Sequence, residues 1–163
     1  MNRVVIADSS ALIPLDRRGE LHLLGAHEVF IPPAVGKELV DDALKTARDL
    51  ERISLPLSHL LEASASRFKE LMERGQITVH KIDYIKYSGI IDETRRRLGK
   101  LDVKKEHRVK KGDCEIVALC QQFIDNGYDV TVLCEDRHLK EGVFPQLVPD
   151  VKVISFKEFL NEI

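Results

Sequence analysis

Cysteine is scarce in this chain: Cys114, Cys120 and Cys134 are the three present, and no two of them have C-x-x-C spacing. An odd number without that spacing argues against a disulfide framework and a zinc site, and favours a reducing compartment. The sequence also lacks a basic leader followed by an apolar run, and it has no stretch of roughly 18 apolar residues that would span a bilayer. We therefore expect a cytoplasmic protein with no membrane partner.

Several enzyme motifs are missing as well. No G-x-G-x-x-G fingerprint, Walker loop or nucleophile elbow occurs in the sequence, which leaves dinucleotide binding, P-loop chemistry and serine hydrolysis without support. An aspartyl phosphotransfer enzyme with Asp8 as its nucleophile would need a second Asp two residues on, where this chain has Ser10. That alternative is the weakest of those considered.

Basic residues are unevenly distributed. Residues 95–111 carry nine of the 25 Lys and Arg residues but only two of the 27 Asp and Glu residues, so this segment is formally +7 and the rest of the chain −9. We interpret residues 99–112 as an exposed loop whose lysines hold an RNA backbone without reading bases. The candidate substrate contacts are Lys104, Lys105, Lys110 and Lys111. The alternative is a solvated connection.

The order of apolar segments predicts the fold class. The 163 residues suffice for one domain, 1–163, with a sizeable core. Short β-branched runs predict strands at 4–7, 29–31, 77–82, 130–134 and 151–154, and the stretches between them predict helices at 10–24, 34–53, 58–74, 84–98, 113–126 and 156–163. Strands alternating with helices predict an α/β fold with a mostly parallel sheet and helices on both faces.

Four acidic residues stand near junctions where a strand ends and a helix begins: Asp8, Glu38, Asp113 and Asp136. The carboxyl ends of parallel strands form the ligand crevice of an open α/β sheet, so these acids can converge there. Converging carboxylates require a cation, and oxygen-only ligands suit Mg²⁺ or Mn²⁺. The pattern therefore indicates metal-assisted chemistry on a phosphate ester.

Each acid also has a simpler interpretation. Asp8, Asp113 and Asp136 stand where a helix N-cap would stand, and Asp is a good N-cap. Glu38 taken alone would be a solvated helix residue. Three independent caps and one solvated glutamate, however, have no reason to fall at one edge of a sheet. Glu115 is the reserve ligand, although it lies about 200° around the helix from Asp113.

Four segments together resemble the motifs of the PIN-domain nucleases. Val-Val-Ile-Ala-Asp8-Ser-Ser-Ala-Leu-Ile resembles the opening strand and turn of that family, and Ile-Pro-Pro-Ala-Val-Gly-Lys-Glu38-Leu resembles its second motif. Gly-Asp113-Cys-Glu-Ile-Val-Ala-Leu-Cys is similar to the acid-led helix, and Thr-Val-Leu-Cys-Glu-Asp136 to the last acidic motif. The four occur in the family's order over almost the whole chain.

This resemblance implies a three-layer α/β/α sandwich with a central, mostly parallel sheet of about five strands. It also implies that the four acids hold one or two Mg²⁺ or Mn²⁺ ions and that water attacks a single-stranded RNA, leaving 5′-phosphate and 3′-hydroxyl ends. Asp8 and Asp113 would bind the ion directly, Asp136 would bind a second ion or act through water, and Glu38 would orient water. Ser9 or Ser10 would contact a phosphate oxygen, or serve only as turn residues.

Two alternatives concern activity and partners. Cys134 stands where many family members carry Ser or Thr, and a thiol is a poor partner for a hard metal or phosphate. The chain would then be a catalytically weak RNA-binding or scaffold module with the same fold. If it is an active endoribonuclease, the family includes both antitoxin-bound toxins and stand-alone RNA-processing enzymes, and an antitoxin protein or a homodimer partner is expected on that ground.

Overall fold

The protein is built around a five-stranded parallel sheet, as its computed structural model shows for residues 2–101 and 109–162. The strands are β1 (Arg3–Ala7), β2 (Val29–Ile31), β3 (Ile77–Val79), β4 (Asp129–Leu133) and β5 (Lys152–Ile154), arranged in the order β3-β2-β1-β4-β5. All four neighbouring pairs are parallel. The chain therefore builds outward from β1 in one direction and then returns to add β4 and β5 on the other side.

Alternation along β1 explains why both faces of the sheet are covered. Val4 and Ile6 lie in one buried cluster, whereas Val5 and Ala7 lie in the other. Successive side chains of a strand point to opposite faces, so an uninterrupted apolar strand needs a helical layer on each side. The sequence meets that need with helices after each of the five strands, which pack on the two faces of the sheet.

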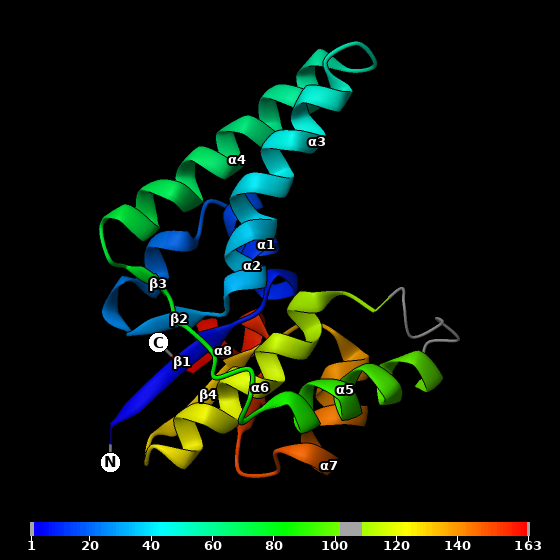
Figure 1. Cartoon of the computed structure of the whole chain (residues 1–163). Coiled ribbons are helices and arrows are strands. Elements are labelled where there is room, and N and C mark those ends of the chain that lie inside the picture. The colour runs from blue at the N-terminus through cyan, green and yellow to red at the C-terminus, as the bar shows by residue number, and fades with distance from the viewer. Residues whose placement is uncertain (1, 102–108, 163) are drawn as a thin grey trace.

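The helices form two layers. One layer packs against the Val4 face and contains α5 (Ser88–Leu101), α6 (Lys111–Asp125), the π-helical η4 (His138–Val143) and α7 (Phe144–Leu147). The other contains α1 (Ser9–Arg17), the 3₁₀ turn η1 (Leu21–Ala26), α2 (Pro33–Lys37), the π-helical η2 (Glu38–Asp42), α4 (Leu55–Glu73) and α8 (Phe156–Glu162). The predicted three-layer α/β/α sandwich is confirmed (Figure 1).

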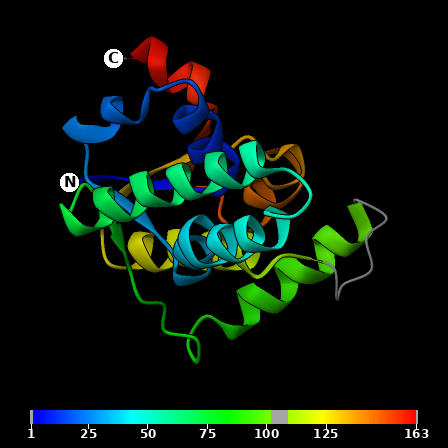
Figure 2. The ribbon, with the colours of Figure 1, turned by 90° about the horizontal axis from the view of Figure 1, so that it is seen from above.

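A helical arm extends from this sandwich. Helix α3 (Ala43–Leu50) follows η2, and the chain reverses into the long helix α4, whose N-cap Ser54 accepts the Leu57 N–H at 3.4 Å. The two helices run side by side in both views (Figures 1 and 2), and Figure 1 shows them extending away from the sheet. Ile53, Leu55 and Leu60 near its tip are exposed, whereas Phe68 at the other end of α4 is buried in the core.

Several predicted boundaries were wrong. The strand predicted to reach residue 82 ends at Val79, and the helix predicted from residue 84 begins at Ser88, because Asp83 accepts the Lys86 N–H and holds the intervening residues in turns. The helix predicted for residues 10–24 ends at Arg17, where Gly19 follows with a left-handed φ of 70°. A helix was expected to begin at Asp136, but its range was not predicted; the segment after β4 forms η4 and α7.

The predicted basic loop at residues 99–112 was too long at both ends. Helix α5 continues to Leu101, and α6 begins at Lys111. Lys104 and Lys105, two of the predicted RNA contacts, lie outside the described residues. Within the part of the chain that the structure does describe, no helix is long and apolar enough to cross a bilayer.

Candidate active site

The candidate site lies at the carboxyl ends of β1 and β4, where the order in which strands are added to the sheet reverses. β1 and β4 are neighbours in the sheet although their residues are more than 120 positions apart, and the segments that leave their carboxyl ends diverge to opposite sides. The Asp8 N–H donates to the Leu133 carbonyl at 2.9 Å and extends the pairing one residue beyond β1. Such a switch point is the usual ligand crevice of an open α/β sheet.

Asp8 is buried at the floor of this crevice, only 2% exposed. Its Oδ2 accepts a 2.8 Å hydrogen bond from the Ser10 hydroxyl and lies 3.9 Å from the Cys134 Sγ. Burial raises the pKa of Asp8, the Ser10 hydrogen bond opposes that shift, and the charges of Glu38 and Asp136 add to it. Asp8 occupies the N-cap position of α1, but its side chain makes no capping hydrogen bond. Capping of α1 therefore does not occupy its carboxylate.

Glu38 reaches the same crevice from the junction of α2 and η2. Its Oε2 accepts a 3.1 Å hydrogen bond from the Ser9 hydroxyl, and its Oε1 lies 3.5 Å from the Lys110 Nζ. A Cβ on Gly112 would stand 3.6 Å from Oε2 and 3.4 Å from a Val35 methyl, so the start of α6 lies beside Glu38 and α2. Glu38 is thus held by partners far away in sequence and is not a freely solvated helix residue.

Asp113 enters from the first turn of α6. The predicted capping role was wrong, because the helix begins at Lys111 and Lys110 occupies the N-cap position. Burial raises the pKa of Asp113 to about 7, the charges of Asp8, Asp136 and Glu38 contribute, and the Lys110 ammonium opposes them. The charges of the other three acids therefore act on Asp113 in addition to its burial.

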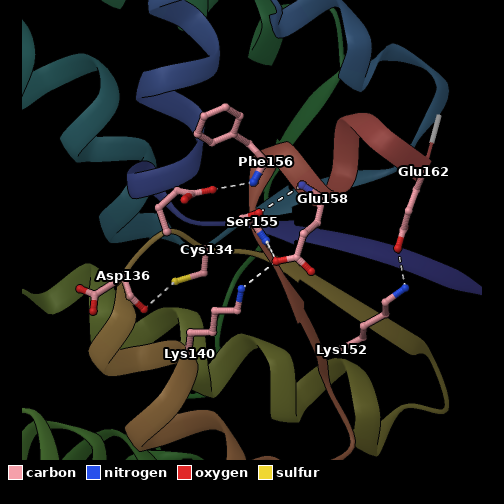
Figure 3. A network of polar contacts seen from close by, with 9 residues as sticks. Cys134, Asp136, Lys140, Lys152, Ser155, Phe156, Glu158 and Glu162 are labelled. Carbon is pink, nitrogen blue, oxygen red and sulfur yellow. Dashed lines mark hydrogen bonds and ion pairs between the residues drawn. The ribbon is translucent and has the colours of Figure 1, made fainter.

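Asp136 follows β4 and does cap a helix. Its Oδ1 accepts the N–H groups of His138 and Leu139 at 2.9 and 3.2 Å. Its carboxylate points away from Lys140, whose ammonium pairs with Glu158 at 2.8 Å (Figure 3). Capping and membership of the acidic group are compatible, because both backbone N–H groups donate to the same carboxylate oxygen.

The donor set suits a hard divalent cation. Asp8, Glu38, Asp113 and Asp136 offer only oxygen ligands, which Mg²⁺ and Mn²⁺ prefer, and a cation would relieve their mutual repulsion. Among the residues that the structure describes, no three Asp, Glu, His or Cys side chains already form a metal-binding cluster. These residues therefore fit a divalent cation by the type of their ligand atoms and by their charge.

Cys134 is part of the crevice floor. The thiol is fully buried, and burial followed by the Asp8 charge raises its pKa, so it stays neutral. It is a weak donor toward the Asp8 Oδ2 at 3.9 Å and the Asp136 carbonyl at 3.8 Å (Figure 3). Ser10 bridges the same region by accepting the Glu135 N–H at 3.0 Å, a role that sequence reasoning missed because it joins positions 125 residues apart.

The basic segment divides into two groups. Arg95, Arg96 and Arg97 pair with Asp92 and Glu93 on the same helix. Lys110 and Lys111 are exposed and stand beside the acidic residues Glu38 and Glu115. These two lysines are therefore at the mouth of the candidate site, as their position next to Asp113 predicted.

Glu115, the reserve ligand, faces a neighbouring site. It is 1% exposed, and its Oε1 accepts the Ala34 N–H at 3.0 Å, in the first turn of α2. The predicted separation of about 200° from Asp113 places it on this side of α6. No sequence signal distinguished this buried contact from the ordinary exposure of a helical glutamate.

Comparison with known proteins identifies the family. A model of the halobacterial PIN domain matches residues 25–161, which is most of the chain. This chain belongs to the PIN-domain family. PIN domains are generally nucleases. The matched residues include Glu38, Asp113 and Asp136, whereas Asp8 precedes the matched range. The comparison with curated proteins gave no match.

Proposed function

We propose that this PIN domain is a metal-dependent endoribonuclease that hydrolyses phosphodiester bonds of single-stranded RNA. The observation that supports it is the shared electrostatic environment of four acids from four elements, seen in the raised pKa of Asp113, about 7, to which Asp8, Asp136 and Glu38 all contribute. Active sites are where such perturbed groups gather.

Each residue has a proposed role. Asp8 and Asp113 would hold a Mg²⁺ or Mn²⁺ ion directly, and Asp136 would hold a second ion or act through water. The ion, when bound, would polarise the phosphate and lower the pKa of the attacking water. Glu38, fixed by Ser9 at 3.1 Å, would orient that water, and Ser9, Lys110 and Lys111, with Lys104 and Lys105, would contact phosphates.

Incubation with a mixed RNA pool tests the proposal. Cleavage should require Mg²⁺ or Mn²⁺, stop in EDTA and be lost in Asp8→Asn and Asp113→Asn, because each removes a charged ligand. Product ends should be 5′-phosphate and 3′-hydroxyl. Cleavage that survives both substitutions would reject the assigned site.

A catalytically weak RNA-binding module is the second candidate, and Cys134 favours it. A neutral thiol stands against Asp8 where a hydroxyl would be the stronger donor. RNA binding without metal-stimulated cleavage would select this function. Co-expression with the product of a small neighbouring reading frame tests the proposed antitoxin, and light scattering on the purified chain tests the proposed homodimer.

A further inference from the structure

A pocket of about 640 Å³ adjoins the acidic crevice and shares Glu38 with it. Its walls come from α2, from the first turns of α6 and from the turn before α5, and they include Ala34, Lys37, Tyr84, Lys111 and Glu115. A pocket of this size accommodates a nucleoside. Its position beside the four acids means that a nucleotide within it would be next to the phosphodiester that the crevice receives.

Glu115 is the unusual group in this pocket. Its Oε2 is buried and makes no well-formed hydrogen bond among the described residues, and the Lys111 Nζ is 3.9 Å away. The Tyr84 hydroxyl also interacts with this carboxylate, because burial and then Glu115 raise the Tyr84 pKa. A buried carboxylate oxygen without a donor is costly, so this atom is poised for a ligand that brings one. Lys111 and Tyr84 beside it are exposed and can shift to admit such a ligand.

The arrangement of donors and acceptors selects among bases. Lys111 offers a cationic donor, and Glu115 offers acceptors directly beside it. Guanine presents the complementary edge, with O6 as acceptor followed by the N1 and N2 donors. Adenine, cytosine and uracil each place an acceptor where a carboxylate would repel it. The Tyr84 ring in the pocket wall can add stacking contact, as aromatic side chains do with bases of single-stranded RNA.

We propose that this pocket binds a guanine base of the RNA next to the cleaved phosphodiester, with Glu115 accepting from N1 and N2 and Lys111 donating to O6. The proposal rests on the proposed nuclease function for its biological meaning, but the binding itself requires neither metal nor catalysis. It makes Glu115 a specificity residue and leaves the chemistry to the four acids.

Nucleotide binding in EDTA tests the pocket separately from cleavage. Titrations with GMP, AMP, CMP, UMP and inosine monophosphate, followed by NMR of the amide signals, should show GMP binding about tenfold more tightly than the others. Inosine monophosphate, which lacks the N2 amino group, should lose much of that preference. Glu115→Gln should abolish it, because the amide N–H₂ confronts the N1 and N2 donors, while its oxygen can still accept from Ala34.

Glu73→Gln is the matched control. Glu73 is an exposed glutamate at the C-terminal end of α4, and its substitution removes the same charge. Lys111→Met is the second variant in case Glu115→Gln fails to fold, since Lys111 is exposed. Its loss should remove the guanine preference, and any lost phosphate contact should weaken all four nucleotides alike. Equal binding of the four nucleotides, or a preference unchanged in the folded variants, would overturn the proposal.

Mapping of cleavage positions separates the two proposals. The unmodified protein should cut next to guanine, and Glu115→Gln should cut the same RNA without that preference. Cleavage with no preference for guanine would reject the pocket and leave the nuclease function standing. Guanine binding without any cleavage would support the pocket and reject the nuclease function.

Discussion

The Ser9 hydroxyl donates to the Glu38 carboxylate at 3.1 Å and so ties the first turn of α1 to the start of η2. π-helical turns often mark functional sites, and this one begins at the residue proposed to orient water. Two segments 29 residues apart thereby fix one carboxylate oxygen at the crevice.

Glu38→Gln should lower turnover more than metal affinity. The amide keeps an acceptor for Ser9 but loses the charge that orients water. Ser9→Ala, which preserves that charge and frees the carboxylate to rotate, is the companion variant and should have the smaller effect. Single-turnover cleavage and Mn²⁺ titration measure the two quantities, and an equal loss of both would make Glu38 an ordinary ligand.

The apo protein should become less stable as pH rises from about 4 to about 7. The pKa of Asp113 is raised from 3.8 to about 7, so the folded state retains a proton that the unfolded chain has released. The resulting stability is fully present below the unfolded pKa and is lost as pH passes the folded one, by at most about 4 kcal/mol. The raised pKa of Asp8 acts in the same direction.

Denaturant unfolding in EDTA at several pH values measures this effect. Asp113→Asn should flatten the profile, since the amide does not titrate. Saturating Mn²⁺ at a hundredfold excess over its dissociation constant should add about 2.7 kcal/mol to the unmodified protein at pH 7. A profile that rises with pH in EDTA would contradict the assigned coupling.

Asp136→Asn should raise the apo melting temperature by a few degrees. It removes one of the repelling charges, while the amide oxygen can still accept from His138 and Leu139; a gain of about 1 kcal/mol shifts the midpoint by roughly 2–4 °C in a protein of this size. Asp129→Asn, exposed at the opposite end of β4, is the control. Calorimetry in EDTA measures the melting temperature of both variants. An equal change in both would contradict the proposed repulsion among the four acids.

Cys134→Ser should increase metal-dependent cleavage near pH 6 and reduce stability by about 1 kcal/mol. A hydroxyl is a stronger donor than a thiol, so it should favour the ionised form of Asp8 and its competition for the ion against protons. The cost arises from placing a hydroxyl at a buried position. Cys114→Ser, also buried but under the influence of Arg95, is the control, and cleavage rates between pH 5.5 and 8 reveal any difference.

Replacing Lys104, Lys105, Lys110 and Lys111 with Gln should weaken binding to all RNA backbones. Each lost phosphate contact should reduce the logarithmic salt slope by roughly 0.7. The titration uses a short unstructured RNA at several salt concentrations, with Asp8→Asn in both arms to prevent cutting. An unchanged salt slope of the RNA affinity would mean that the basic segment is only a solvated connection between helices.

The sequence predicted the parts of the fold that local pattern determines. The strand at Val29–Ile31 was predicted to the residue, because a β-branched apolar run followed by two prolines admits little else. The start of α5 was missed because the Asp83 turn, a local hydrogen bond to Lys86, replaces four residues of helical pattern. The η2 and η4 turns depend on packing against distant helices and have no local signature.

The same division applies to the candidate site. Strand ends pointed to Asp8 and Asp136, because the edge of a parallel sheet can be inferred from topology. The partners that fix each carboxylate could not be inferred: Ser10 reaches Glu135, and Glu115 reaches the Ala34 N–H, across 125 and 81 positions. Such contacts exist only after the layers pack.

The hydrogen bond from Asp8 to Leu133 has a consequence for protein synthesis. A ribosome makes Asp136 128 residues after Asp8, and β4 is likewise made long after β1. Until then β1 has no β4 neighbour, and three of the four carboxylates cannot meet the fourth. Under the proposed function, a nascent chain would therefore gain its complete set of four acids, and with it nuclease activity, only after residue 136 has emerged.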